Sequence, residues 1–357
     1  MQALLGVIFH FIGGGASSSF YVPYKKVKGW SWESFWILGG FFSWLIAPFV
    51  AAWLTIPQFG EIIRNTDSST LGYTYLYGVL WGIGGLTYGL GVRYLGVSLG
   101  SSIILGLSMV IGALLPSIYY EFYPTMGKEG IALYFTTNWG VITLLGLALC
   151  ILGVYLCGRA GVRKEKELGG HSDASGNKEF NLGLGLLVAV ISGALSACFN
   201  FGLEAGKPMA NVANELWKAV HPNQGEFLFQ NNVTYIVVLW GGITTNLIYC
   251  AALLWRNKSY KDYFDRQTPR GRNFLLCALG GTMWYLQFFF YGMGESKLGN
   301  GASSWILHMA FIILLANAWG VILKEWKGVS RKTYATIVAG IAVIIVSVLL
   351  VGFAKEI

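Results

Sequence analysis

The sequence predicts an all-α membrane protein whose ten transmembrane helices form two inverted repeats of five. Three observations predict this fold: the composition, the number of long apolar stretches and the placement of basic residues. Of the 357 residues, 55% are hydrophobic and 12% are charged. Soluble domains carry about 25% charged residues, so the chain has about half of the charge that a water-exposed surface needs.

Ten apolar stretches are long enough to cross roughly 30 Å of hydrocarbon. The predicted helices cover residues 3–22, 33–54, 72–92, 98–119, 139–158, 182–203, 233–254, 272–294, 301–323 and 334–354. The 48 glycines and 14 tryptophans suit closely packed helices with aromatic belts at the membrane faces. Because no charged n-region or small-residue cleavage site precedes Lys25, we expect the first stretch to be a retained helix and not a signal peptide.

Basic residues alternate between successive loops. All but six of the 25 Lys and Arg residues fall in the odd-numbered loops. Since Lys and Arg mark the cytoplasmic side, both termini are predicted to lie outside. This topology also explains the net charge of +8, so membrane lipid is an expected partner and nucleic acid is not. The six exceptions are Arg64, Lys128, Lys207, Lys218, Lys297 and Lys355.

The chain divides at a charged segment, 159–181, which we predict to be a cytoplasmic linker. Residues 1–158 form the first predicted five-helix repeat and residues 182–357 the second. An odd number of helices in each half reverses the orientation of the second half, as in many transporters. Weak internal similarity supports the repeat: Gly6, Ile12, Gly14, Ser17 and Phe20 align at one offset with Gly185, Ile191, Gly193, Ser196 and Phe199.

The sixth predicted loop, residues 204–232, is long and lies outside. Apolar residues recur at helical spacing after Pro208, which can start a helix. We expect a short amphipathic helix there. It is either an anchor at the membrane surface or a lid over an outer mouth.

Ionisable residues inside membrane helices indicate function, because lipid penalises charge. Only His10 and His308 lie well inside the predicted helices, at depths that the topology makes similar. A neutral imidazole can pass a proton near neutral pH, so both are proton-coupling candidates; the alternative is packing against a neighbouring hydroxyl. Glu33 either stabilises the first turn of the second helix or gates the cytoplasmic side by exchanging a proton for a lysine.

The eighth predicted helix places one amide, Gln287, among aromatic rings. An unpartnered amide in hydrocarbon costs a few kcal/mol, whereas aromatic rings can cover the C–H face of a sugar and an amide can bond its hydroxyls. Helical spacing puts Trp284, Gln287 and Tyr291 on one face and Tyr285 elsewhere. The candidate substrate-binding residues are Trp284, Gln287, Tyr291, Tyr285, Asn200, Trp81, Tyr88, Trp305, His10 and His308.

Enzyme motifs are absent from the sequence. It contains no Walker A loop, no HExxH, no GxSxG and no paired carboxylates within a predicted span. The five cysteines lie in apolar stretches without metal spacing, so no cofactor is expected. The alternatives that stay open are a proton-driven exporter of a small neutral compound, a membrane enzyme acting on a sugar lipid and a sugar sensor. The sequence sets no oligomeric state.

Several motifs occur in order along nearly the whole chain. They include Phe20–Lys28, Trp30–Glu33, Tyr88-Gly89-Leu90, Lys207-Pro208-Met209, Met283–Tyr291 and Leu307-His308-Met309. In these residues the chain resembles the bacterial L-rhamnose–proton symporters of the drug/metabolite transporter superfamily.

The resemblance implies the drug/metabolite transporter fold, with a central site between the two repeats. It also implies uptake of L-rhamnose with a proton, by alternating access, across the bacterial inner membrane. A 6-deoxy sugar has a methyl group for aromatic walls and hydroxyls for Gln287 and Asn200. The resemblance assigns no proton site.

Overall fold

A computed structural model describes residues 2–95, 97–124, 128–168, 182–322, 324 and 326–355. Most of the predicted linker, residues 169–181, lies outside this part of the chain. All regular structure within the described residues is helical. Nine of these helical stretches are long and apolar enough to cross a membrane: 2–24, 32–55, 100–122, 138–167, 183–205, 232–257, 270–298, 301–322 and 331–353.

These stretches confirm an all-α, multi-pass membrane protein. They correspond to nine of the ten predicted helices. The tenth predicted range, 72–92, lies inside a 28-residue helix, α6 (Ser68–Leu95), which is not among these nine stretches. The ten-helix count and the five-plus-five repeat therefore stay predictions.

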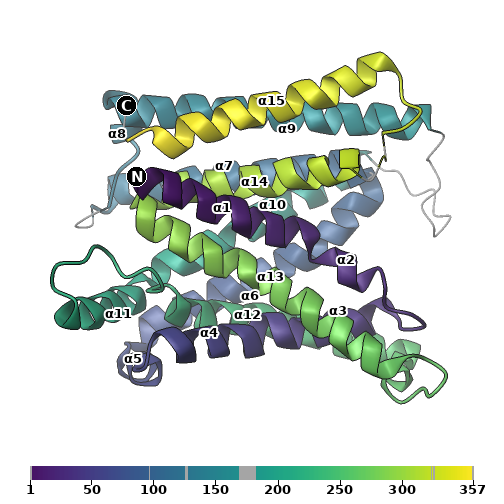
Figure 1. The fold of residues 1–357 in the computed structure, drawn as a ribbon, viewed down its shortest axis with the longest axis horizontal. Coiled ribbons are helices and arrows are strands. Elements are labelled where there is room, and N and C mark those ends of the chain that lie inside the picture. Colours follow the sequence, from purple (N-terminus) through teal and green to yellow (C-terminus); the bar gives the residue numbers. More distant parts are fainter. Residues whose placement is uncertain are drawn as a thin grey trace. The chain divides into compact units, whose positions relative to one another are not determined.

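The chain forms two compact units (Figure 1). Unit 1 contains Met1–Val7, Gly84–Ala197 and Asn300–Ile357, and unit 2 contains Ile8–Ile83 and Cys198–Gly299. Helices α1 (Gln2–Ser19), α6 and α10 (Leu182–Ala205) contribute residues to both units. Each unit combines residues from both halves of the sequence. An inverted repeat does not require each half to pack as a unit, so the predicted repeat boundaries are untested.

Unit 1 is built mainly from four long helices. They are α7 (Val97–Phe122), α9 (Asn138–Glu167), α14 (Gly301–Ile322) and α15 (Arg331–Phe353), with the short α8 (Leu133–Thr136) before α9. Helices α9 and α15 lie side by side along their length (Figure 1). Ser347 Oγ donates a hydrogen bond to the Gly146 carbonyl at 2.7 Å, and a Cβ on Gly153 would lie 3.0 Å from the Gly340 carbonyl oxygen. Small residues thus permit the close approach that membrane helices favour.

Unit 2 contains the segments on which the candidate site is built. They are α2 (Tyr21–Tyr24), α3 (Trp32–Phe41), the π-helix η1 (Phe42–Ile46), α4 (Ala47–Thr55), α5 (Phe59–Asn65), α11 (Lys207–Val220), α12 (Asn232–Asn257), the 3₁₀ turn η2 (Ser259–Tyr263) and α13 (Arg270–Leu298). Helix α13 packs against α2, α3 and η1, and α12 packs against α3, η1 and α4.

Helix α11 is the short amphipathic helix predicted after Pro208. Its Met209 and Ala213 are buried together with Ile56, Ile62 and Val233 of unit 2. Other apolar side chains of α11, such as Val220, are exposed. The rest of unit 2 therefore covers only part of the apolar surface of α11. The two predicted roles of this helix, a membrane anchor or a lid, both stay predictions.

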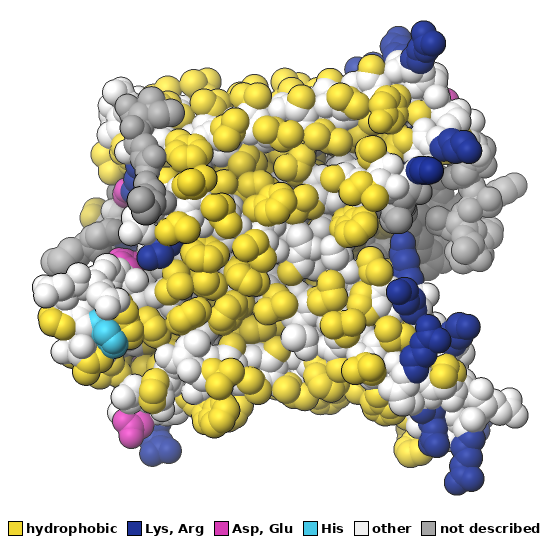
Figure 2. Space-filling view, viewed as in Figure 1, with side chains coloured by type: hydrophobic (Ala, Val, Ile, Leu, Met, Phe, Trp, Pro, Cys, Tyr) yellow, Lys and Arg dark blue, Asp and Glu magenta, His cyan; other side chains and the backbone are white. Residues whose placement is uncertain are grey.

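The predicted cytoplasmic loops gather at one end of each unit. In unit 2, the Lys28 backbone exchanges two hydrogen bonds with Asn273, which joins the basic stretches 25–28 and 256–272. In unit 1, Glu167 accepts hydrogen bonds from Ser330, which joins the ends of α9 and α15. Hydrophobic side chains cover most of the face drawn in Figure 2, and Lys and Arg side chains lie at its edges, which is typical of a membrane-spanning protein.

Candidate functional site

The site begins at an irregular turn in the second membrane span. Helix α3 widens into η1 at Phe42–Ile46 before α4 begins at Ala47. Pro48 supplies a physical reason, because its ring nitrogen carries no hydrogen and cannot bond the carbonyl four residues earlier, that of Trp44. Single π-turns in helices often occur at functional sites.

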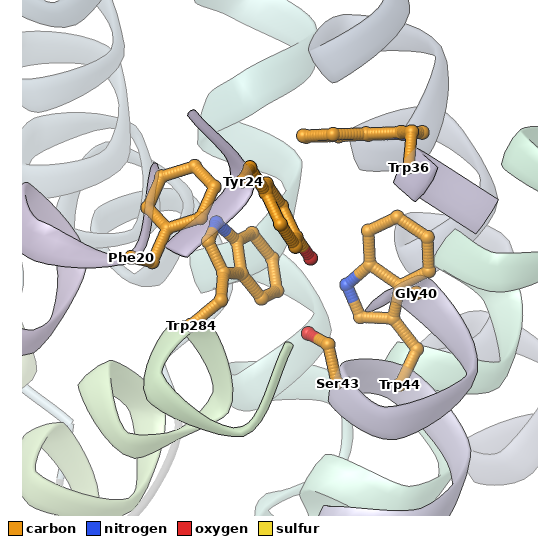
Figure 3. A pocket seen from close by; sticks show the side chains of 7 residues that line it. All are labelled: Phe20, Tyr24, Trp36, Gly40, Ser43, Trp44 and Trp284. Atoms are coloured by element: carbon orange, nitrogen blue, oxygen red, sulfur yellow. The ribbon is translucent and has the colours of Figure 1, made fainter. Parts of the chain in front are cut away.

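Seven residues around this turn line a pocket in unit 2 (Figure 3). They are Phe20, Tyr24, Trp36, Gly40, Ser43, Trp44 and Trp284. Helices α2, α3 and α13 and the η1 turn supply six of these residues, and Phe20 lies between α1 and α2. Five of them are aromatic, and Gly40 leaves room for the Trp44 ring, since a Cβ there would lie 2.7 Å from a ring carbon. The pocket is therefore walled by flat apolar surfaces.

Polar atoms also point into this pocket. Ser43 Oγ and Trp44 Nε1 are buried and have no hydrogen-bond partner in the described part of the chain. In Figure 3 both atoms, and the Tyr24 hydroxyl, are directed toward the space between the rings. Because buried donors are nearly always bonded, two such atoms on the wall of one pocket indicate a place for a polar ligand.

The rings are held in position by contacts behind the pocket. Trp284 packs edge-on against Trp44 with ring centroids 5.6 Å apart, and it lies 5.5 Å from Trp81. Trp36 donates its indole N–H to Asn246 Oδ1 at 3.0 Å. These contacts set the orientation of the rings in the conformation described here.

The cavity in this pocket is about 10 Å³, roughly the room for one water molecule. Ligand pockets are typically roughly 300–1,000 Å³. A hexose therefore needs the surrounding rings to move apart before it fits.

The residues of the aromatic run on α13 that line the pocket differ from those that the sequence predicted. Trp284 lines the pocket, and its role as a sugar contact stays a prediction. Gln287 does not line it; its Nε2 donates to the Trp284 carbonyl at 2.9 Å within the same helix. Tyr285 is buried against Tyr235 at 6.5 Å, away from the pocket, as its helical position indicated.

A second group of polar residues in unit 2 surrounds Tyr291. The Tyr291 hydroxyl donates to Asn200 Oδ1 at 3.3 Å. The His10 ring meets the Tyr291 ring edge-on at 5.4 Å and packs on Gly294, where a Cβ would lie 2.6 Å from His10 Nε2. The structure thus brings three sequence-predicted residues together, outside the aromatic pocket.

Glu33 lies in the first turn of α3, as predicted. Its carboxylate is buried and accepts hydrogen bonds from Asn257 Nδ2 at 2.9 Å and from Ser259 Oγ. Both partners are neutral. These bonds tie the start of α3 to the end of α12, and a gating role for Glu33 stays a prediction.

Three predicted site residues belong to unit 1. Tyr88 donates to Ser101 Oγ at 2.7 Å, and Trp305 donates its indole N–H to the Ser108 carbonyl at 3.0 Å. His308 is 2% exposed and lies one turn after Ser304 on α14. The common depth predicted for His10 and His308 is a relation between the two units and stays a prediction.

Comparisons with known proteins identify the family of this chain. The family model for the L-rhamnose-proton symport protein (RhaT) matches residues 1–356. The L-rhamnose-proton symporter of Pectobacterium carotovorum subsp. carotovorum is 38% identical over 356 residues, which cover 98% of this chain and 97% of that protein. The symporter of Klebsiella pneumoniae subsp. pneumoniae is 39% identical over 354 residues, with the same coverage. The chain belongs to this symporter family.

Membership of the L-rhamnose-proton symport family makes the chain a transporter and not an enzyme. It also confirms the resemblance drawn from the sequence motifs. The family and the apolar helices together identify a multi-pass inner-membrane protein. Export, sugar-lipid chemistry and sensing are not favoured.

Sequence reasoning missed most of the pocket in this symporter. The residues that it did not single out are Phe20, Tyr24, Trp36, Gly40, Ser43 and Trp44. One signal was present: Trp36, Gly40 and Ser43 share a face at ordinary helical spacing. Trp44 lies four residues after Gly40, so the same spacing places it on that face too.

Proposed function

We propose that this chain imports L-rhamnose together with a proton by alternating access, with both termini outside. The observation that carries the proposal is the aromatic pocket of unit 2, in which unpartnered Ser43 and Trp44 donors lie between ring faces. A 6-deoxy sugar needs both features, since its methyl and C–H groups suit rings and its hydroxyls suit donors. The names of the relatives support the substrate.

Because the sugar is neutral, coupling to a proton means that each transport cycle moves net positive charge across the membrane. If one proton enters with each sugar, a membrane potential of 100 mV contributes about 2.3 kcal/mol to uptake. We propose no cofactor besides this proton. His10, His308 and Glu33 remain the candidates that the sequence provides for carrying it.

Purified protein in lipid vesicles tests the function. An inward proton gradient is expected to drive radiolabelled L-rhamnose above its external concentration, and a protonophore to abolish that accumulation. L-mannose, which carries a CH₂OH group where L-rhamnose carries a methyl group, should compete poorly because the rings would bury the added hydroxyl without a partner. Uptake that ignores the gradient would remove the coupling, and absence of uptake would remove the substrate.

Replacing Ser43 with alanine tests the polar side of the pocket. We expect sugar affinity to fall by roughly two- to tenfold, the value of one hydrogen bond of about 0.5–1.5 kcal/mol. Stability should not fall, because the hydroxyl has no partner in the described part of the chain and its removal leaves nothing unpaired. The measurements are equilibrium binding and thermal unfolding in detergent. Unchanged affinity would exclude Ser43 from the site.

A further inference from the structure

A partly buried ion pair lies near the end of α13. Lys207 Nζ and Glu295 Oε1 are 3.0 Å apart, and their side chains are 23% and 11% exposed. The second carboxylate oxygen of Glu295 accepts a hydrogen bond from Asn231 Nδ2 at 2.7 Å. Burying such a pair gains little stability, because desolvation offsets the attraction. Stability alone therefore does not explain the pair.

Lys207 is held in place and charged. It is the first residue of α11, and Thr234 Oγ1 fixes the preceding junction by donating to the Gly206 carbonyl at 3.0 Å. Burial alone would lower the pKa of Lys207, but Glu295, Glu204 and Glu226 hold that pKa above its usual value. In this conformation the Lys207 ammonium therefore neutralises the charge of the Glu295 carboxylate.

The ion pair and the sugar pocket share one helix. Trp284 and Glu295 are eleven residues apart on α13, roughly 16 Å along a helix axis. Phe288 and Tyr291 lie between them, with Phe288 packed on Trp284 at 4.9 Å and Tyr291 bonded to Asn200. If α13 shifts when sugar binds, the carboxylate of Glu295 therefore shifts with it.

We propose that Glu295 carries the transported proton and that Lys207 takes the place of this proton in the conformation described here. The inference rests on the proposed symport function. When α11 withdraws Lys207, Glu295 would be left as a lone buried charge, which favours protonation. One O–H bond forms on the carboxylate with a proton from outside. That bond breaks when Lys207 returns, and the proton leaves toward the inside.

The surroundings of Glu295 suit this exchange. The other titratable or charged groups that face the pair are Glu204, Glu226, Tyr235, Tyr291 and His10. Glu33 sits at the opposite end of unit 2, where α3 starts and α12 ends. In the predicted topology the Glu295 end faces outside, which is the side from which the proton enters.

Replacing Glu295 with glutamine in lipid vesicles tests the proposal. The amide can still accept from Asn231 but cannot ionise. We expect exchange of labelled for unlabelled L-rhamnose to persist, and accumulation driven by the proton gradient to be lost. The pH dependence of the KM should also flatten. Glu61→Gln removes an exposed carboxylate of α5 and should leave accumulation at the wild-type level.

Each outcome separates the two proposals. If wild-type protein does not accumulate L-rhamnose, the proposed function fails. If wild-type and Glu295→Gln proteins both accumulate it, the function stands and the role of Glu295 is overturned. Should the single variant not reach the membrane, the variant with both Lys207→Gln and Glu295→Gln decides, because it leaves no unpaired buried charge. Gradient-driven accumulation by that variant would equally overturn the role.

Discussion

Replacing Trp284 with alanine is expected to weaken L-rhamnose binding by about ten- to a hundredfold. Trp284 contacts several other rings, including those of Phe20 at 6.4 Å, Trp44 at 5.6 Å and Trp81 at 5.5 Å. Losing the apolar surface of one large side chain costs about 1.5–3 kcal/mol, which gives this range of affinity. Binding measured in detergent and the KM for uptake both report the change.

Two further substitutions make the Trp284 result specific. Trp284→Phe keeps a flat ring and should recover most of the affinity. Trp255→Ala removes a tryptophan of α12 that is 82% exposed and should leave affinity unchanged. Equal losses in Trp284→Ala and Trp255→Ala would show a general effect on the protein and would contradict a sugar contact.

Replacing Gly78 with alanine is expected to lower the free energy of unfolding of the protein by about 1–3 kcal/mol or more, the usual cost of overpacking. A Cβ on Gly78 would overlap the Val238 carbonyl oxygen, and a Cβ on Gly241 would lie 2.6 Å from the Val79 nitrogen. Both obstacles are backbone atoms, which cannot rotate away. Helices α6 and α12 would have to separate, and Trp81 would lose its position behind the pocket.

Gly72 provides a matched control on the same helix. A Cβ there meets nothing within 4 Å, and alanine is favoured over glycine in a helix by roughly 0.5–1 kcal/mol. Thermal unfolding in detergent should therefore show Gly72→Ala at or above wild-type stability and Gly78→Ala well below it. Equal stability of the two variants would contradict the close contact between α6 and α12.

The transmembrane helices follow from composition and hydropathy, because hydrocarbon requires long apolar segments wherever the chain crosses it. The amphipathic α11 follows in the same way from helical spacing. The residues of the pocket can be predicted from the sequence only in part. Trp284 was predicted from its aromatic neighbours, but spacing gives the face of a helix and not the side-chain conformation. Gln287 therefore bonds its own backbone, and no sequence pattern excludes that.

The ion pair was missed for a different reason. Lys207 and Glu295 each lie at a helix end, where charged residues are ordinary in a membrane protein. They are 88 residues apart, and only the packing of α10, α11 and α13 brings them together. Long-range pairs of this kind depend on tertiary structure, which local patterns do not contain.

The π-turn at Phe42–Ile46 has a mechanical consequence. Where Pro48 removes a backbone hydrogen bond, the span is less stiff than the regular helix on either side, so it bends there at the lowest energetic cost. Ser43 and Trp44 are part of that same turn. A ligand bound by these two residues therefore contacts the most flexible part of the span. Bending of the span in turn changes the contacts that the two residues make with the ligand.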